Sequence, residues 1–199
     1  MNMKGKFRVS LVVVALGATA LLAGCSSAPS RHGLAAGERN AAISPQARQD
    51  FDAAMQAIKA EEFEKGIALM DKVASESQKT AVPLINLALA QKNVGKLEQA
   101  EANLKKALAL EPDNPVASNE LAILYRKTGR FAESRQVYES ILKKYPHFPL
   151  ANKNLGILCD LYLRDYACAL KGYQAYSTAM PDDKSARIWI ADVQKRLGN

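Results

Sequence analysis

From about residue 47 to the C-terminus, apolar residues recur at intervals of three and four, which is the spacing of one face of an α-helix. The pattern predicts one amphipathic helix through Leu84 and Ala88 and a second one from Leu97 to Leu108. The small side chains of Ala88 and Ala100 allow these two helices to approach closely. Together the two segments predict a helical hairpin.

The same pattern returns at a fixed interval of 34 residues, which is typical of a fold built from stacked structural repeats. The residues that keep the interval are Leu87, Leu121 and Leu155; Ala88, Ala122 and Gly156; Gly95 and Gly129; and Pro112 and Pro146. Phe131 and Tyr166 are 35 residues apart, so one residue is inserted between Leu155 and Tyr166. We place this insertion in the turn around Leu163–Asp165.

A single hairpin cannot bury both of its apolar stripes, so the units must stack, and the stack needs a terminal cap. The segment 184–197 is the predicted cap, with Ile190, Val193 and Leu197 as its buried stripe. Trp189 has two possible roles: it packs onto the last repeat, or it stands exposed as a binding anchor.

This repeat resembles the tetratricopeptide repeat (TPR), in which a helix, a tight turn and a second helix are followed by the Pro that opens the next unit. Four units are predicted, of which the first is the weakest match: residues 47–80, 81–114, 115–148 and 149–183. The first unit keeps Phe63, Met70 and Val73 at the matching apolar positions but lacks the closing Pro. The resemblance implies an all-α, TPR-type helical-hairpin solenoid, with residues 184–199 as its C-terminal capping helix.

The first 24 residues have the layout of an export signal. Three basic residues in Met1–Arg8 are followed by an apolar run, residues 9–23, that is short for a transmembrane helix. The run leads into the letters LAGC at residues 22–25, which resemble the lipobox of bacterial lipoproteins. The resemblance implies a signal peptide over residues 1–24, cut before Cys25, and a lipid such as palmitate on Cys25. The alternatives are an uncleaved anchor and ordinary cleavage after small residues.

Residues 25–46 follow as the lipidated Cys and a flexible tether, because Ser26 to about Ser44 is small and polar without an apolar period. Ser26, and not Asp, follows Cys25. By resemblance to lipoproteins of two-membrane bacteria, this residue implies export to the outer membrane. We therefore expect a protein held by lipid at the periplasmic face of the outer membrane.

The charge of the chain points away from nucleic acid. The 27 Lys and Arg residues against 20 Asp and Glu give a formal net charge of +7. Removal of residues 1–24 takes away three basic residues and no acidic one, which leaves +4. A charge of this size does not call for nucleic acid as a partner.

Candidate catalytic chemistry is sparse. The two His residues stand near no other metal ligand, and Gly95 and Gly129 are single turn residues rather than a phosphate-binding cluster. We therefore expect no metal, no cofactor and no enzymatic activity.

Cys159 and Cys168 lie at similar distances on either side of the turn at Leu163–Arg164. In an antiparallel hairpin this places their side chains near each other, and an oxidising compartment permits a disulfide. The alternative is a pair of small buried thiols. Their spacing is not the C-x-x-C of redox catalysis or of zinc sites.

In the TPR family the first helices of the units line a concave groove that receives a protein or an extended peptide. Projected onto this chain, the family pattern gives five candidate binding residues: Asn86, Asn119, Arg126, Lys153 and Asn154. Amide groups can both donate to and accept from a peptide backbone, and the cations can hold a carboxylate. The apolar residues of the same face, Leu89, Ile123 and Ile157, either contact the partner or pack between neighbouring first helices.

The chain is similar to small TPR lipoproteins of type IV pilus biogenesis, which help the secretin ring to assemble, and to TPR lipoproteins associated with TonB systems. This similarity implies an outer-membrane-anchored scaffold that docks a partner in its groove during assembly of an envelope machine. The alternative is a tether for cell-wall enzymes or for components of polysaccharide export.

Overall fold

The computed structural model describes residues 44–77 and 79–198, and every regular element within these ranges is helical. The α-helices are α2 (Pro45–Lys59), α3 (Phe63–Glu76), α4 (Val82–Asn93), α5 (Leu97–Leu110), α6 (Pro115–Lys127), α7 (Phe131–Lys144), α8 (Pro149–Leu158), α9 (Tyr166–Ala179) and α10 (Ser185–Leu197). A π-helical turn, Cys159–Leu163, continues α8. In this part of the chain, no helix combines the length and the apolarity that crossing a bilayer requires. The predicted signal peptide, Cys25 and most of the predicted tether lie outside the described residues.

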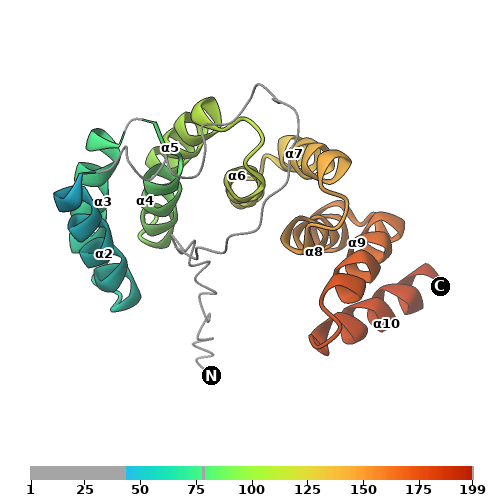
Figure 1. The fold of residues 1–199 in the computed structure, drawn as a ribbon. Coiled ribbons are helices and arrows are strands. Elements are labelled where there is room, and N and C mark those ends of the chain that lie inside the picture. The colour runs from blue at the N-terminus through green and yellow to red at the C-terminus, as the bar shows by residue number, and fades with distance from the viewer. Residues whose placement is uncertain (1–43, 78, 199) are drawn as a thin grey trace, which may run out of the picture.

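Consecutive helices pair as hairpins, and the hairpins stack side by side into an arch (Figure 1). The pairs are α2 with α3, α4 with α5, α6 with α7 and α8 with α9, and α10 packs on α9 at the C-terminal end. In Figure 1, α4, α6 and α8 lie on the inner side of the arch and α5, α7 and α9 on its outer side. The predicted all-α solenoid of helical hairpins is therefore confirmed.

Proline and short polar side chains determine where the first helix of a hairpin begins. Pro occupies the first turn of α2, α4, α6 and α8, where the missing N–H removes no helical hydrogen bond. The hydroxyl of Ser44 accepts a hydrogen bond from the N–H of Ala47 at 3.0 Å, and Asn114 caps α6 in the same way. Because of this cap, α2 begins at Pro45, two residues before the start of the first predicted unit.

Each hairpin passes its turn through a residue with left-handed backbone conformation. The residues are Glu61 (φ 62°), Gly95 (φ 80°), Gly129 (φ 77°) and Arg164 (φ 54°). Glycine adopts this conformation at little cost, whereas Glu61 and Arg164 adopt it against the steric preference of L-residues. The packed helices on either side therefore impose the turn geometry even where the local sequence disfavours it.

The inserted residue of the last unit lies in the π-helical turn Cys159–Leu163, one turn earlier than the prediction placed it. Arg164 matches the left-handed Gly129 at an interval of 35 residues, so the insertion precedes Arg164. An α-helix accommodates one additional residue as a single π turn. The repeat interval reveals that a residue was added, but not where the backbone absorbs it.

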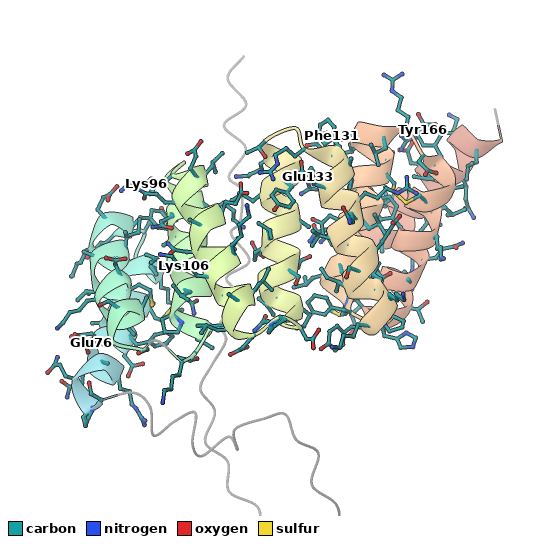
Figure 2. The ribbon with its side chains drawn as sticks, turned by 90° about the horizontal axis from the view of Figure 1, so that it is seen from above. Glu76, Lys96, Lys106, Phe131, Glu133 and Tyr166 are labelled. Carbon is teal, nitrogen blue, oxygen red and sulfur yellow. A yellow bond between two sulfur atoms is a disulfide. The ribbon has the colours of Figure 1, made fainter. Side chains whose placement is uncertain are left out.

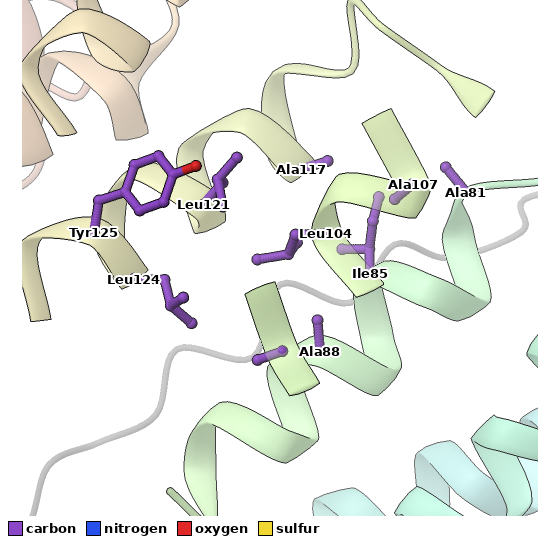
Figure 3. Packing of buried hydrophobic residues seen from close by; sticks show 10 residues of the cluster. Ala81, Ile85, Ala88, Leu104, Ala107, Ala117, Leu121, Leu124 and Tyr125 are labelled. Atoms are coloured by element: carbon purple, nitrogen blue, oxygen red, sulfur yellow. The ribbon is translucent and has the colours of Figure 1, made fainter. Parts of the chain in front are cut away.

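The apolar core consists of three clusters, each shared by neighbouring helices. Figure 3 shows the middle cluster, in which Leu104 of α5 lies between Ile85 of α4 and Leu121 of α6. Ala88 and Ala100 are fully buried, in agreement with the predicted close approach of α4 and α5. Because each cluster joins one hairpin to the next, the stability of a hairpin depends on its neighbours.

The terminal helix α10 packs on α9 through a stripe that differs in one residue from the predicted one. Val193 is buried and Ile190 is half-buried, but Leu197 is 46% exposed. The buried stripe instead begins at Ala186, one turn before Ile190. Two helices that cross at an angle separate on either side of the contact, so the last residue of α10 lies beyond it.

Ion pairs connect successive hairpins along the edge where the outer helices begin. Figure 2 marks this edge with Lys96 before α5, Phe131 at the start of α7 and Tyr166 at the start of α9. The pairs are Glu64 with Lys96 (2.9 Å), Glu101 with Arg130 (2.8 Å) and Arg135 with Asp165 (3.0 Å). Each pair joins a residue of one outer helix to the residue that precedes the next outer helix.

Candidate partner-binding groove

The inner face of the arch presents one apolar side chain from each of α4, α6 and α8. Leu89, Ile123 and Ile157 follow one another at intervals of 34 residues, and each is half-buried. All three pack against the buried clusters while part of each side chain stays exposed. This geometry is compatible both with packing between neighbouring first helices and with contact with a partner.

Polar side chains link the inner helices to one another. Lys92 of α4 forms an ion pair with Glu120 of α6. The amide of Asn154 in α8 donates a hydrogen bond to the side-chain oxygen of Asn119 in α6 at 3.0 Å. These contacts cross from one hairpin to the next, so they help to set the spacing of the inner helices.

The structure corrects the expectation that the amide groups of Asn86 and Asn119 are open to a partner. Asn86 is 4% exposed and donates to the carbonyl of Val82 at 3.0 Å, within its own helix. Asn119 is 1% exposed and is held by Asn154. The register of the repeat assigns a residue to a helix face, but burial on that face depends on how closely the next helix approaches. Asn154 is half-buried, and its binding role remains a prediction.

Lys153 lies against aromatic rings of the C-terminal helices. Its ammonium group is 5.1 Å from the ring centre of Tyr176 and 5.0 Å from that of Trp189. Trp189 also lies 5.4 Å from the ring of Tyr173, so it packs onto the last repeat. The cation is therefore stabilised by ring faces rather than by an ion pair. Lys153 is half-buried and remains partly accessible from the inner face.

Asp160 joins the capping helix to the last repeat. Its carboxylate accepts a hydrogen bond from Nη1 of Arg196 in α10 at 2.6 Å and another from the hydroxyl of Tyr173 at 3.1 Å. Contact with Asp160 raises the pKa of Arg196 above its usual value, and burial raises the pKa of Tyr173, with Asp160 adding to that rise. Asp160 is buried, so it serves the cap.

Arg126, like Lys153, has no carboxylate partner in the described part of the chain. No Asp or Glu of these residues lies within 4.0 Å of its guanidinium, and the buried Nη1 has no hydrogen-bond partner. The ring of Tyr162, in the π-helical turn, has its centre 5.8 Å from Cζ of Arg126. The guanidinium is thus held in place but not neutralised.

Cys159 and Cys168 form a disulfide that joins the two helices of the last hairpin, with their Cα atoms 5.8 Å apart. With Asp165 they are the only group of three potential metal ligands that lie close together in the described ranges. The two sulfurs are bonded to each other, and Asp165 caps α9 and pairs with Arg135. This arrangement stabilises the hairpin and leaves no thiolate to bind an ion.

Clefts on the outer side recur between successive outer helices. One of about 670 Å³ lies between α7 and α9, over Leu155 of α8, and another of about 450 Å³ lies between α3 and α5, over Leu87 of α4. Because Leu87 and Leu155 occupy the same position of the repeat, these clefts reflect the spacing of the outer helices. They are features of the stack rather than one specific site.

Tyr162 is a neighbour of Arg126 that the sequence does not predict. It lies in the π-helical turn that accommodates the inserted residue, so the 34-residue register does not place it. The available signal was the interval of 35 residues itself, because a π turn changes which side chains a helix presents.

Comparison with known proteins assigns the repeat. The sequence model of the tetratricopeptide repeat matches residues 94–153. A stretch of 98 residues is 30% identical to SPINDLY of Solanum lycopersicum, which is named as a probable UDP-N-acetylglucosamine–peptide N-acetylglucosaminyltransferase. That match covers 48% of this chain but 10% of SPINDLY, so this chain spans about a tenth of that relative.

Several solved structures share the fold. MamA of Desulfovibrio magneticus RS-1 has a TM-score of 0.67 at 17% identity, over 79% of this chain and 88% of that one. PilF of Pseudomonas aeruginosa has a TM-score of 0.69 at 17% identity, over 80% and 70% of the two chains. A tetratricopeptide repeat protein of Parabacteroides merdae has a TM-score of 0.67 at 19% identity, over 78% and 62%.

These comparisons and the stacked hairpins define the class of protein. The described chain is an α-helical solenoid of the TPR type. At identities of 17% to 19%, the structural likeness shows the fold alone.

Proposed function

We propose that this protein is a lipid-anchored scaffold of the outer membrane that docks a protein partner against its inner face during assembly of an envelope machine. The main support for docking is the set of apolar and basic side chains on the inner helices. Three successive hairpins present Leu89, Ile123 and Ile157 in line, and the cations Arg126 and Lys153 of the same helices have no carboxylate partner among residues 44–77 and 79–198. A long surface of this kind suits an extended segment of another protein.

The membrane part of the proposal depends on the LAGC letters that end at Cys25. A single acyl chain binds a bilayer only marginally, at about 0.8 kcal/mol per buried methylene, and a second chain makes the anchoring stable. The predicted tether that follows would let the solenoid reach partners near the membrane surface.

The machine that we favour is a type IV pilus with its secretin, or a TonB-type transport system. Support comes from the similarity of the sequence to TPR lipoproteins of these systems. A tether for cell-wall enzymes or for polysaccharide-export components would use the same inner face for other partners, so the identity of the partner decides between the two.

The anchor is tested by replacing its acceptor, Cys25→Ala, and labelling growing cells with a radioactive fatty acid. We expect the wild-type chain to carry the label and to sediment with outer membranes, and the variant to lose both properties. Label on the variant would contradict the lipid assignment.

The docking function is tested by reversible crosslinking in intact envelopes, followed by purification of the tagged chain. We expect a secretin or a TonB-system protein to co-purify. Ile157→Gln, on the inner face, should reduce recovery, whereas Leu110→Gln, at an exposed position of outer helix α5, should not. Equal recovery with both variants would contradict docking on the inner face.

A further inference from the structure

Within the described residues, Arg126 has weaker partners than the cations Lys92, Lys153 and Arg196. Lys92 is matched by Glu120, and Arg196 is matched by Asp160 and Asp192. Lys153 is stabilised by two aromatic rings. Arg126 has one aromatic neighbour and, among residues 44–77 and 79–198, no carboxylate within ion-pair distance.

The position of Arg126 is costly for the folded protein. Its Nη1 atom is buried without a hydrogen-bond partner, and a buried donor that is left unpaired lowers stability. The hydroxyl of Tyr138, from the neighbouring helix α7, is also buried without a partner. Burial raises the pKa of Tyr138 above its usual value, and the positive charge of Arg126 opposes that rise.

The π-helical turn places the partly exposed ring of Tyr162 beside this cation. Leu161 is 65% exposed and Tyr162 is 47% exposed, and both lie within the turn. The ring of Tyr162 is fixed by Phe131, whose ring centre is 5.0 Å away. A held guanidinium therefore stands next to a held aromatic ring, at the point where the inserted residue interrupts the regular repeat.

We infer that Arg126 and the π-helical turn form a subsite for an acidic side chain and an adjacent apolar side chain within an extended segment of the docked partner. The carboxylate pairs with the guanidinium, which binds planar carboxylates through two parallel hydrogen bonds, and the apolar neighbour lies on Tyr162 and Leu161. This inference rests on the proposed function and specifies the chemistry of its partner.

The charge of the surface and the shape of the groove favour this occupant. An acidic group compensates the charge of Arg126, which has one aromatic neighbour and no ion pair within the described residues. The inner face continues from α6 to α4 on one side and to α8 on the other, so a bound segment passes Arg126 in both directions (Figure 1). An internal Asp or Glu therefore fits this place better than the terminal carboxylate of a chain.

The test uses the full chain in detergent with its disulfide oxidised, and a library of acetylated and amidated octapeptides. In matched pairs, one central position is Glu or Gln and the next is Leu or Ser. We expect the wild-type chain to bind Glu-Leu peptides at least tenfold more tightly than Gln-Leu or Glu-Ser peptides. Peptides with Gln at the centre and a free C-terminal carboxylate measure terminal recognition separately.

Three variants locate the subsite. Arg126→Met should abolish the preference for Glu over Gln, and Tyr162→Ala should reduce the preference for Leu over Ser. Lys106→Met removes one positive charge from the outer helix α5 and should preserve both preferences. Arg126→Met should also unfold at the same or a higher temperature than the wild type, because it removes an unpaired buried donor.

The outcomes separate the two proposals. Binding of apolar peptides without a preference for Glu would overturn the subsite and leave the docking groove in place. A preference that survives Arg126→Met, or a preference for the free terminal carboxylate alone, would also overturn it. A lower unfolding temperature for Arg126→Met would assign the guanidinium to the fold instead. If the wild-type chain binds none of the peptides, the proposed docking function fails together with the subsite.

Discussion

At the scale of single residues, each hairpin turn contains one residue with left-handed backbone conformation, whether or not that residue type favours it. Gly95 and Gly129 adopt this conformation without steric strain. Glu61 and Arg164 take the same conformation with a side chain attached, so the stack stabilises a geometry that these residues disfavour. A chain whose turns were determined locally would not place the same conformation on Gly, Glu and Arg.

This difference predicts opposite effects for exchanges at equivalent turns. Arg164→Gly should raise the free energy of unfolding by about 0.5 to 1 kcal/mol, because relief of steric strain exceeds the added flexibility of the unfolded chain. Gly129→Ala should lower it by about 1 kcal/mol, because a side chain is placed at φ 77°. Urea unfolding followed by circular dichroism measures both, and a loss of stability in Arg164→Gly would contradict the assignment.

Buried tyrosines give single residues an effect on stability at high pH. Burial, with help from Asp183, raises the pKa of Tyr176 to about 12. An unfolded tyrosine loses its proton near pH 10, whereas Tyr176 in the folded chain keeps it until higher pH. Between about pH 10 and 12 unfolding therefore releases a proton, and stability falls as the pH rises.

We expect the urea midpoint of the wild type to fall more steeply above pH 10 than that of Tyr176→Phe, which has no proton to release. At pH 8 the variant should be less stable, because it lacks the hydrogen bond of 2.6 Å to Asp183. Parallel pH profiles of the two proteins from pH 8 to 11 would show that Tyr176 does not carry the effect.

At the scale of helices, the ion pair at the last junction of the outer edge has the opposite sense to the two before it. Glu101 and Arg135 occupy the same position of the repeat, but Glu101 pairs with Arg130 whereas Arg135 pairs with Asp165. A hairpin that slipped to the wrong neighbour would bring like charges together. Because the acidic and basic residues swap places between these two junctions, the ion pairs favour one order of the hairpins.

Arg135→Glu should place like charges at the junction with α9 and lower the free energy of unfolding by about 0.5 to 1 kcal/mol, more than the neutral control Arg135→Gln. The difference between the two variants should shrink in 0.5 M salt, because exposed charges are screened (about 10 Å Debye length at 0.1 M). Equal stability of the two variants at low salt would show that charge at this junction is unimportant.

The sequence predicts elements well where the repeat carries the information, and contacts poorly where it does not. The 34-residue interval identifies every hairpin from α4 to α9, because each interval repeats the same helical stripes. It cannot place the inserted residue, because a π turn and a longer loop change the interval equally. It also cannot tell that Asn119 is buried, since that depends on Asn154 from the next unit.

At the scale of the whole molecule, the stack converts local contacts into one continuous surface. Each core cluster joins neighbouring helices, so the arch is held by a chain of nearest-neighbour contacts. The same arrangement places the helices α4, α6 and α8 next to one another on the inner side (Figure 1). A surface assembled from several hairpins can hold a segment longer than any one of them could contact.

The most direct test of the account is photocrosslinking in intact cells with benzoylphenylalanine at single positions of the chain. At Tyr162, beside the inner face, an aromatic ring replaces an aromatic ring that is 47% exposed, and at Leu110, in an outer helix, the side chain is 41% exposed. The account predicts a specific crosslinked partner from position 162 and none from position 110. Crosslinks from position 110 alone, or none from position 162 in cells that contain the partner, would contradict docking on the inner face.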